Sequence, residues 1–372
     1  MTARNAVSRS LAVLAAALAC MALASCGGGS DDSDSDAEIP AGTFVGVAPE
    51  GDQNATDYAR MADGGVGVVR IVFQWSSIET KKGIYDWAAT DQVMADIASA
   101  GLEPLVTVFG TPGIYEKSPT DPPTASDDTL DAWSDFLAAA AERYGEGGDF
   151  WTDFAETSPD VTAQPIREWE IWNEPNSSNF WTPKPDPAAY AELIERSSKV
   201  LDKADPQAQV MSGGMFATPQ SDGAIVSYDF LDQLYGEHGV GDAIDVVGVH
   251  PYGPDVDSVT SQVDDTRKAL DKAGSDTGLW VTEIGWGSDP DVKSDLSETP
   301  EQQASMLSDS FRSLYDSRDE TGVQGVVWYT WHDSVESTIG FCGWCASAGL
   351  VDADRDTKPS WTALTDLTGG TP

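Results

Sequence analysis

Two glutamates follow apolar, strand-like runs of the sequence: Glu174 comes just after residues 169–172, and Glu283 comes just after residues 279–282. An acid in such a place is costly unless it is paired or takes part in chemistry. Two carboxylates facing each other across a sugar-sized gap can break a glycosidic bond: one protonates the leaving oxygen, and the other attacks carbon or activates water. The alternative is two structural glutamates, each paired with an arginine.

The elements that must position these glutamates are short apolar runs separated by helical patterns. Several of the runs are apolar throughout, which is typical of strands buried on both faces of a parallel sheet. Their β-branched composition also favours strands. The expected strands are residues 43–47, 66–73, 105–109, 169–172, 210–212, 244–249, 279–282 and 326–330.

Helical patterns lie between these runs. We expect helices over residues 91–99, 130–144, 188–201, 259–270, 301–315 and 360–367, and two weaker ones over 56–61 and 228–235. The alternation predicts an α/β fold, a single (β/α)₈ TIM barrel that occupies residues 41–372. A doubly wound open sheet is the alternative, but it would need a glycine-rich turn after the first strand, and residues 47–51 do not supply one. In a barrel, the ends of the fourth and seventh strands face each other across the mouth.

Two motifs resemble those of the retaining glycoside hydrolases of clan A, whose barrels carry two carboxylates at the ends of strands four and seven. They are Trp-Asn-Glu-Pro at 172–175 and Thr-Glu-Ile-Gly-Trp at 282–286. Residues 70–75 and 83–87 are similar to members near families 5, 39 and 42, and residues 349–352 and 358–361 resemble the segment that closes such barrels. The resemblance implies hydrolysis of O-glycosidic bonds, expected to be β-linked, in an oligo- or polysaccharide, with no metal and no organic cofactor.

The resemblance also implies roles for individual residues. Glu174 would be the general acid/base and Glu283 the nucleophile of a double displacement, with roughly 5–5.5 Å between the carboxyl groups. The pKa of Glu174 should be raised by apolar surroundings and by the charge of Glu283. The other expected site residues are Asn173 at the sugar 2-hydroxyl, Tyr252 holding Glu283, His250 lining the subsite of the cleaved sugar, and Arg70 keeping Glu283 ionised.

Aromatic residues and long loops are expected to shape the sugar-binding cleft. Tyr329 and Trp331 share one face of the eighth strand, whereas Trp328 points the other way. The resemblance implies a tryptophan near this point beneath the cleaved sugar, and we favour Trp331. Residues 110–128 and 145–165 are long enough to form loops above the barrel mouth. Trp75, Trp181 and Trp286 could equally be cleft walls or core residues.

The composition restricts the partners of the chain. Lys and Arg number 21 against 62 Asp and Glu, a formal net charge of −41. Such a surface repels phosphate backbones, so a nucleic-acid partner is excluded, and so is charge-driven docking on anionic lipid. The acidity makes a polyanionic substrate unfavourable as well.

The N-terminal residues predict export. Arg4 and Arg9 precede an apolar run at 11–23, and residues 23–27 (LASCG) resemble a bacterial lipobox. We therefore expect a signal peptide at residues 1–25, lipidation of Cys26, and an acidic tether over residues 26–40. The protein would be anchored by this lipid to the outer side of the bacterial cell membrane, or secreted if the lipobox is not used.

Two cysteines remain, Cys342 and Cys345, in a Gly- and Ser-rich connection. In an exported protein a small disulfide that closes a loop is the leading interpretation. A thioredoxin-like redox site would need a strand before the first cysteine and a helix that starts at this cysteine. A zinc site would need a second pair of ligands.

Three functions are compatible with the chain: a retaining glycosidase, a carbohydrate-binding lipoprotein that captures glycans without cleaving them, and a redox protein. Both glutamates are present, which favours the glycosidase over a binding protein. A redox function would leave the glutamates at the strand ends unexplained.

Overall fold

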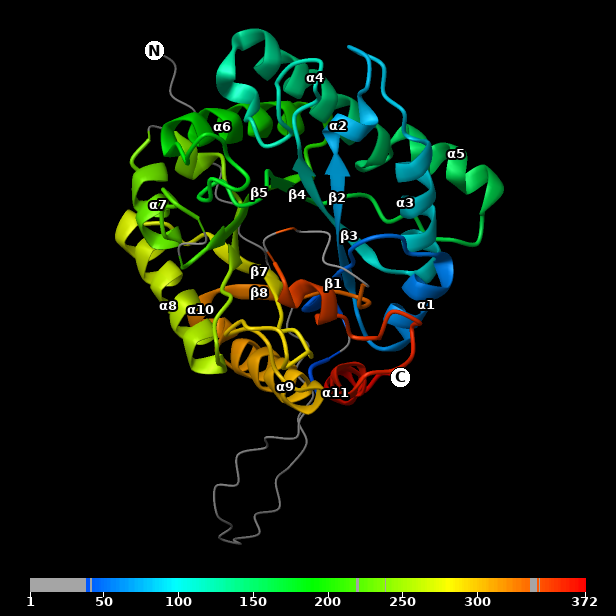
Figure 1. Cartoon of the computed structure of the whole chain (residues 1–372). Helices are drawn as coiled ribbons and strands as arrows, with labels where there is room; N and C mark the ends of the chain where they lie inside the picture. Colours follow the sequence, from blue (N-terminus) through cyan, green and yellow to red (C-terminus); the bar gives the residue numbers. More distant parts are fainter. Residues whose placement is uncertain (1–37, 41, 219–220, 238, 335–339, 341) are drawn as a thin grey trace, which may run out of the picture. The chain divides into compact units, whose positions relative to one another are not determined.

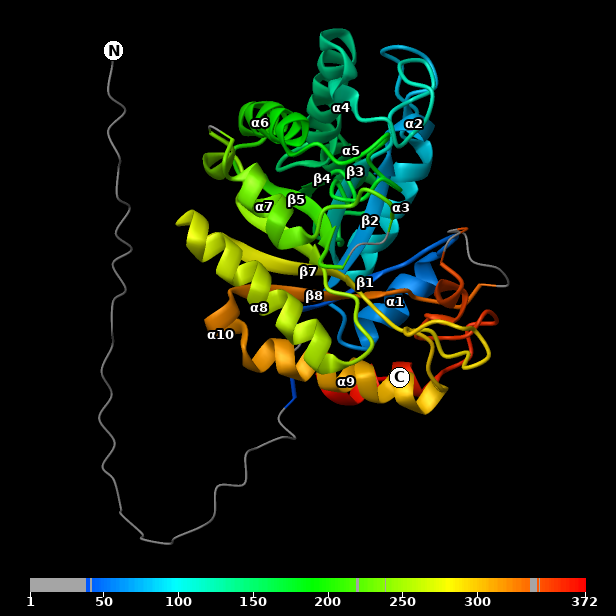
Figure 2. The ribbon, with the colours of Figure 1, turned by 60° about the vertical axis from the view of Figure 1, so that its left-hand side comes forward.

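The computed structural model describes residues 38–372 except 41, 219–220, 238, 335–339 and 341. Eight parallel strands, β1 to β8, close into a barrel in chain order, and helices form a layer around it (Figure 1). Neighbouring helices in sequence also pack side by side, as α8 and α9 do outside β7 and β8 (Figures 1 and 2). The predicted (β/α)₈ barrel is therefore confirmed.

The strands are β1 (Val45–Ala48), β2 (Val68–Gln74), β3 (Glu103–Phe109), β4 (Glu168–Ile171), β5 (Gln209–Phe216), β6 (Val246–His250), β7 (Gly278–Ile284) and β8 (Val323–Tyr329). The helices are α1 (Ala55–Asp63), α2 (Trp75–Ile78), α3 (Ala88–Ala100), α4 (Asp127–Tyr144), α5 (Asp149–Thr157), α6 (Pro187–Ala204), α7 (Ser227–Leu234), α8 (Val256–Ala273), α9 (Pro300–Asp316), α10 (Arg318–Thr321) and α11 (Pro359–Thr368), with short 3₁₀ turns η1 (Pro123–Ala125), η2 (Val240–Asp242) and η3 (Trp344–Ser347).

Local sequence signals account for the helix ends. Asn54 and Asp57 form a capping box at the start of α1, and Thr299 and Gln302 form another at the start of α9. Helix α8 ends at Gly274, whose φ of 75° is the left-handed conformation that glycine adopts at low cost. These signals explain why the weakly predicted helix at 56–61 forms as part of α1.

One expectation about the loops is wrong. Residues 145–165 follow helix α4 and precede strand β4, and they contain helix α5. A connection from a helix to the next strand lies at the end of the barrel where strands begin, not above the mouth. The segment 110–128, which follows β3, is on the mouth side, where Thr182 N–H donates to the carbonyl of Thr120 at 3.0 Å.

No helix within the described residues is long and apolar enough to cross a membrane. Residues 1–37, with the expected signal peptide and the expected lipidation of Cys26, lie outside the described residues. Export and lipid anchoring therefore stay predictions.

Two glutamates lie close together at the end of the barrel where strands begin. Glu103 starts β3 and Glu168 starts β4, and both line a cavity of about 140 Å³. Burial, and then the negative charge of Glu103, raise the pKa of Glu168 to about 6. The folded protein therefore disfavours the ionised form of Glu168.

Replacing Glu168 with Gln should stabilise the protein at neutral pH. Because the folded-state pKa is above the unfolded value, the native state binds more protons, and stability falls as pH rises from about 4.5 through 6. Glu168→Gln should raise the free energy of unfolding at pH 7 by about 1 kcal/mol and flatten this part of the profile. Urea unfolding between pH 4.5 and 7.5 measures the free energy of unfolding. Glu103→Gln is the matched control and should raise it by a smaller amount, because it removes only the repulsion by Glu103. If the free energy of unfolding depended on pH in the same way in Glu168→Gln and in wild type, the raised pKa of Glu168 would be contradicted.

Candidate active site

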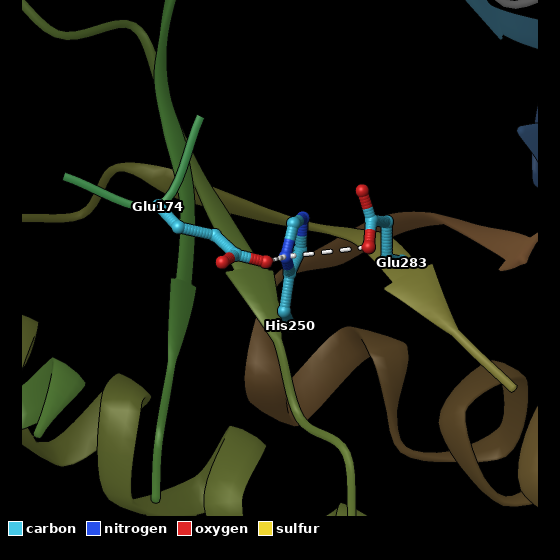
Figure 3. Close-up of side chains that lie close together, drawn as sticks. All are labelled: Glu174, His250 and Glu283. Carbon is cyan, nitrogen blue, oxygen red and sulfur yellow. Dashed lines mark hydrogen bonds and ion pairs between the residues drawn. The ribbon is translucent and has the colours of Figure 1, made fainter. Parts of the chain in front are cut away.

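Glu174 and Glu283 meet at the carboxyl end of the barrel, with His250 between them (Figure 3). One oxygen of each carboxylate and one ring nitrogen of His250 all lie within 4.8 Å of one another. Glu174 follows β4, His250 ends β6, and Glu283 is near the end of β7. Strands far apart in sequence therefore bring three titratable groups to one place.

A β-bulge in β7 turns Glu283 toward the mouth. Trp280 belongs to the apolar cluster inside the barrel, so strict alternation would point Thr282 inward and Glu283 outward. The pairing with β8 shifts by one residue between Val281 and Ile284, which inserts the extra residue of a bulge there. Bulges of this kind re-aim a side chain beside an active site.

The Glu283 carboxylate is held by two donors. Arg70 donates from Nη1 to Oε1 at 2.5 Å, and the Tyr252 hydroxyl donates to Oε2 at 2.9 Å. The Glu283 side chain is 13% exposed, while Arg70 is 4% exposed. A buried cation and a phenol hydroxyl both favour the ionised form of a carboxylate.

Arg70 also binds a carboxylate that we did not predict as a site residue. Its Nε donates to Glu170 Oε2 at 2.6 Å, and Glu170 is fully buried. Glu170 accepts further hydrogen bonds from the Thr107 hydroxyl and, at 2.8 Å, from Gly214 N–H. The rule that selects Glu174 and Glu283 concerns acids that come after an apolar strand, and it passes over Glu170. The position of Glu170 inside the apolar run 169–172 is the signal that could have found it.

Two glycines make room for this buried network. A Cβ at Gly248 would lie 3.2 Å from Glu170 Oε1, and one at Gly214 would lie 2.0 Å from His250 Nε2. Gly214 lies in a bulge of β5, where the pairing with β6 shifts between Ser212 and Met215. Larger side chains at Gly214 or Gly248 would displace the groups that hold the site.

Glu174 is in the opposite electrostatic situation to Glu283. It is 3% exposed, and no positive group contacts it among the described residues. Burial, and then the negative charge of Glu283, raise its pKa well above the usual carboxyl range, although Arg70 partly opposes this. Glu174 is therefore protonated under conditions in which an ordinary carboxyl group is ionised.

The backbone around Glu174 is strained. Trp172 has a φ of 71° and Glu174 a φ of 45°, both in the left-handed region that non-glycine residues rarely adopt. Such strain is of order 1–3 kcal/mol per residue and is typical of functional sites. The fully buried indole of Trp172 donates to the carbonyl of Phe180 at 2.8 Å, which anchors the strained turn.

His250 and Asn173 complete the polar surface of the site. Full burial, helped by the Arg70 charge, lowers the pKa of His250 well below its usual value, so the ring is neutral. Its Nδ1 lies 3.0 Å from Glu174 Oε1. The Asn173 side-chain oxygen accepts from Arg70 Nη2 at 3.0 Å, which leaves its amide nitrogen as a donor.

Apolar and aromatic side chains wall the cavity in which both glutamates lie. The cavity has a volume of about 70 Å³. Its walls include Phe180, Phe216, Leu296, Tyr329 and Trp344, together with the disulfide that joins Cys342 and Cys345, the pairing that the sequence predicts. The sequence analysis missed Trp344 because it lies in a connection where no strand or helix is expected, so no hydrophobic periodicity indicates where its side chain points.

The structure corrects the expectation for Trp331. Its side chain is fully buried away from the carboxylates: the indole donates to Asp57 at 3.0 Å and packs edge-on against Trp361. Strand β8 ends at Tyr329, so the alternation that placed Tyr329 and Trp331 on one face does not extend to Trp331. Tyr329 is the residue of β8 that lines the cavity.

Three other tryptophans, for which cleft wall and core were both open, are core residues. Trp75, Trp181 and Trp286 are each at most 1% exposed. The indole of Trp75 donates to Glu79 at 2.7 Å, and that of Trp286 donates to the carbonyl of Gly253 at 2.9 Å. Buried indoles with satisfied N–H groups have no surface left for a sugar.

Glu174, His250 and Glu283 are also the group whose spacing would suit a metal ion in the described part of the chain. The chemistry of these donors fits a cation poorly. Glu283 is already paired with the buried Arg70, and the raised pKa of Glu174 keeps that group protonated. The arrangement is instead suited to proton transfer by Glu174 beside a negatively charged Glu283.

A barrel with such a carboxyl pair at its mouth is the architecture of glycoside hydrolases. Residues 147–352, more than half of the chain, match the family described as "Glycosyl hydrolase catalytic core", and the chain belongs to that family. Residues 48–128 match the family described as "Beta-galactosidase". No curated protein sequence matches the chain significantly.

Solved glycosidase structures share the fold. A family 39 glycoside hydrolase from Bacteroides cellulosilyticus WH2 has a TM-score of 0.64 and 22% identity, over 87% of this chain and 63% of that one. A glucosidase from Croceicoccus marinus has a TM-score of 0.63 and 16% identity, over 89% and 68%. The intracellular xylanase TsXylA from Thermoanaerobacterium saccharolyticum has a TM-score of 0.57 and 16% identity, over 88% and 98%. The chain thus spans less than two thirds of the family 39 protein.

Removing the Arg70 charge should destabilise the protein strongly. Arg70→Met leaves Glu170 buried without its cation, which should lower the free energy of unfolding at pH 7 by about 3 kcal/mol. Urea unfolding measures this loss. The double variant Arg70→Met/Glu170→Gln is the matched control and should recover a large part of it, because the buried negative charge is gone. Equal stability of Arg70→Met and the wild type would contradict the role of the ion pair.

Proposed function

We propose that the protein is a retaining glycoside hydrolase that cleaves β-linked sugars of an oligo- or polysaccharide. One arrangement carries the proposal: Glu174 and Glu283 have carboxyl oxygens within 4.8 Å of each other in different surroundings, Glu174 buried with a raised pKa and Glu283 paired with Arg70. Two carboxyl groups about 5 Å apart suit a nucleophile and an acid, whereas inverting enzymes need a wider gap for water.

In the first step, the ionised Glu283 attacks the anomeric carbon of the bound sugar. A bond forms between a Glu283 oxygen and that carbon as the bond to the leaving oxygen breaks, and Glu174 gives its proton to the leaving oxygen. Tyr252 and Arg70 hold Glu283 in place for the attack. Asn173 Nδ2 is the donor available to the sugar 2-hydroxyl, an interaction that strengthens in the transition state.

In the second step, water releases the sugar. Once Glu283 is esterified its charge is gone, and one cause of the raised pKa of Glu174 is removed. Glu174, ionised after the first step, takes a proton from water as the water oxygen bonds to the anomeric carbon and the ester to Glu283 breaks. Neutral His250, 3.0 Å from Glu174, keeps a polar contact with that group in both protonation states.

The distinct roles of the two glutamates can be tested with a small nucleophile. Glu283→Ala should lose at least about 1,000-fold in kcat on an aryl β-glycoside, and azide should restore turnover by attacking from the vacated side to give an α-glycosyl azide. Glu174→Ala with azide should give the β-glycosyl azide, because azide then attacks the covalent intermediate. Product configuration is read by NMR. Full activity of Glu283→Ala, or the same azide anomer from both variants, would overturn the assignment.

The pH dependence of activity should report Glu174. The acid must be protonated for the first step, so kcat/KM should be retained at pH values where ordinary carboxyl groups are ionised and be lost as pH rises through the raised pKa of Glu174. In Glu283→Gln, the pKa of Glu174 should fall, because the nearby negative charge is removed. Titration followed by infrared difference spectroscopy measures that shift, with Glu174→Gln as the control that removes the signal. A Glu174 pKa that does not respond to Glu283→Gln would contradict the coupling.

A further inference from the structure

Two fully buried polar atoms beside the catalytic pair have no hydrogen-bond partner within the described part of the chain. They are Nε2 of His250, at the end of β6, and the hydroxyl oxygen of Thr282, in β7. A Cβ at Gly214 would lie 2.0 Å from the first atom and 2.5 Å from the second. Both atoms therefore lie on the same side of Gly214 as close neighbours.

The bulge in β7 explains how Thr282 and Glu283 serve the same region although they are adjacent in sequence. Successive side chains of a regular strand point to opposite faces of the sheet. The pairing of β7 with β8 shifts between Val281 and Ile284, which breaks this alternation. Thr282 is completely buried, whereas the Glu283 side chain is 13% exposed. The bulge thus supplies the site with a carboxylate and with a buried hydroxyl from consecutive residues.

The other ring nitrogen of His250 lies between the two catalytic carboxyl groups (Figure 3). Nδ1 is 3.0 Å from Glu174 Oε1 and 3.6 Å from Glu283 Oε2. Because burial lowers the pKa of His250, the ring is neutral and carries a single N–H. Which nitrogen carries that hydrogen depends on the hydrogen bonds that the two nitrogens make.

The tautomer of His250 decides which oxygen of Glu174 holds the catalytic proton. With the hydrogen on Nδ1, the ring donates to Glu174 Oε1, and the proton of the acid remains on Oε2, a buried atom without a partner among the described residues. With the hydrogen on Nε2, the bare Nδ1 would accept the O–H of Glu174 and would face the carboxylate of Glu283. The first tautomer therefore leaves the proton available to a leaving oxygen.

We propose that Thr282 is a positioning residue: its hydroxyl donates to Nε2 of His250, directly or through one water molecule, and thereby fixes the ring hydrogen on Nδ1. The inference rests on the proposed glycosidase function. A hydroxyl hydrogen can rotate toward a bare nitrogen, and a buried acceptor that lacks a donor is costly. Gly214 permits the contact, because a side chain at this position would collide with both groups.

The tautomer can be measured by NMR on protein labelled with ¹⁵N-histidine, since the chain contains three histidines. In wild type, the His250 ring should be protonated at Nδ1 and bare at Nε2, and the loss of its signal in His250→Gln identifies it. Thr282→Val keeps the shape of the side chain but removes the donor, so the tautomer ratio should shift about tenfold toward Nε2–H. Thr282→Ser keeps the donor and should give the wild-type spectrum.

Kinetics separates this role from a general structural one. Thr282→Val should lower kcat/KM about tenfold on a phenyl β-glycoside, because this poor leaving group needs the proton of Glu174. The loss should be less than about twofold on the dinitrophenyl β-glycoside, whose leaving group departs without a proton. Thr282→Ser should match wild type on both substrates. The matched control is Thr266→Val, at a buried threonine of α8 whose hydroxyl donates to the carbonyl of Gln262 at 2.9 Å, and it should leave both values unchanged.

Four outcomes would overturn the inference: a wild-type His250 protonated at Nε2, an unchanged tautomer in Thr282→Val, equal losses of Thr282→Val on both substrates, or a loss in Thr282→Ser as large as in Thr282→Val. The first needs no variant, and near-UV circular dichroism shows whether each variant is folded. Turnover that wild type shows and Glu283→Ala lacks tests the proposed function separately. Absence of turnover in wild type would contradict that function, whereas the tautomer measured by NMR tests the contact of Thr282 with His250 on its own.

Discussion

The ion pairs of Arg70 are the interaction on which the rest of the site depends. A buried guanidinium is costly unless its charge is matched, and here two carboxylates, Glu170 and Glu283, bind it at 2.6 and 2.5 Å. One positive charge facing two negative ones leaves a negative field at the barrel mouth. Glu174 is buried in that field without a cation of its own among the described residues, and burial, followed by the charge of Glu283, raises its pKa well above the usual carboxyl range. One arrangement of charges thus gives the two glutamates different surroundings: Glu283 is paired with a cation, and Glu174 has a raised pKa.

That arrangement needs departures from a regular barrel. The bulge in β7 turns Glu283 into the mouth, and the bulge in β5 at Gly214 gives the buried Glu170 an N–H donor and leaves space for His250. The strained backbone at Trp172 and Glu174 is a further departure. Local irregularities of this kind are tolerated because the surrounding strands and helices are regular and well packed.

Much of the fold and the centre of the site follow from sequence patterns alone. Apolar runs alternating with helical periods predict eight strand–helix units, because buried parallel strands and amphipathic helices have different hydrophobic periods. Acids placed directly after such runs identify Glu174 and Glu283 as neighbours at the barrel mouth, since parallel strands end at one face. The resemblance to clan A, rather than the strand pattern, implies roles for Arg70, His250 and Tyr252, which the structure brings to these two glutamates.

Only the tertiary structure decided the walls of the site. Alternation along a strand is a local rule, and it failed for Trp331 because β8 ends at Tyr329 and the chain then turns toward α1 and α11. Trp344 is brought to the cavity by a disulfide and by hydrogen bonds to residues distant in sequence, which no periodicity encodes. The sequence by itself determined which strands exist and which acids end them. The pairing of Arg70 with Glu170, the bulges and the aromatic walls depend on contacts between distant segments, and these exist only once the barrel has closed.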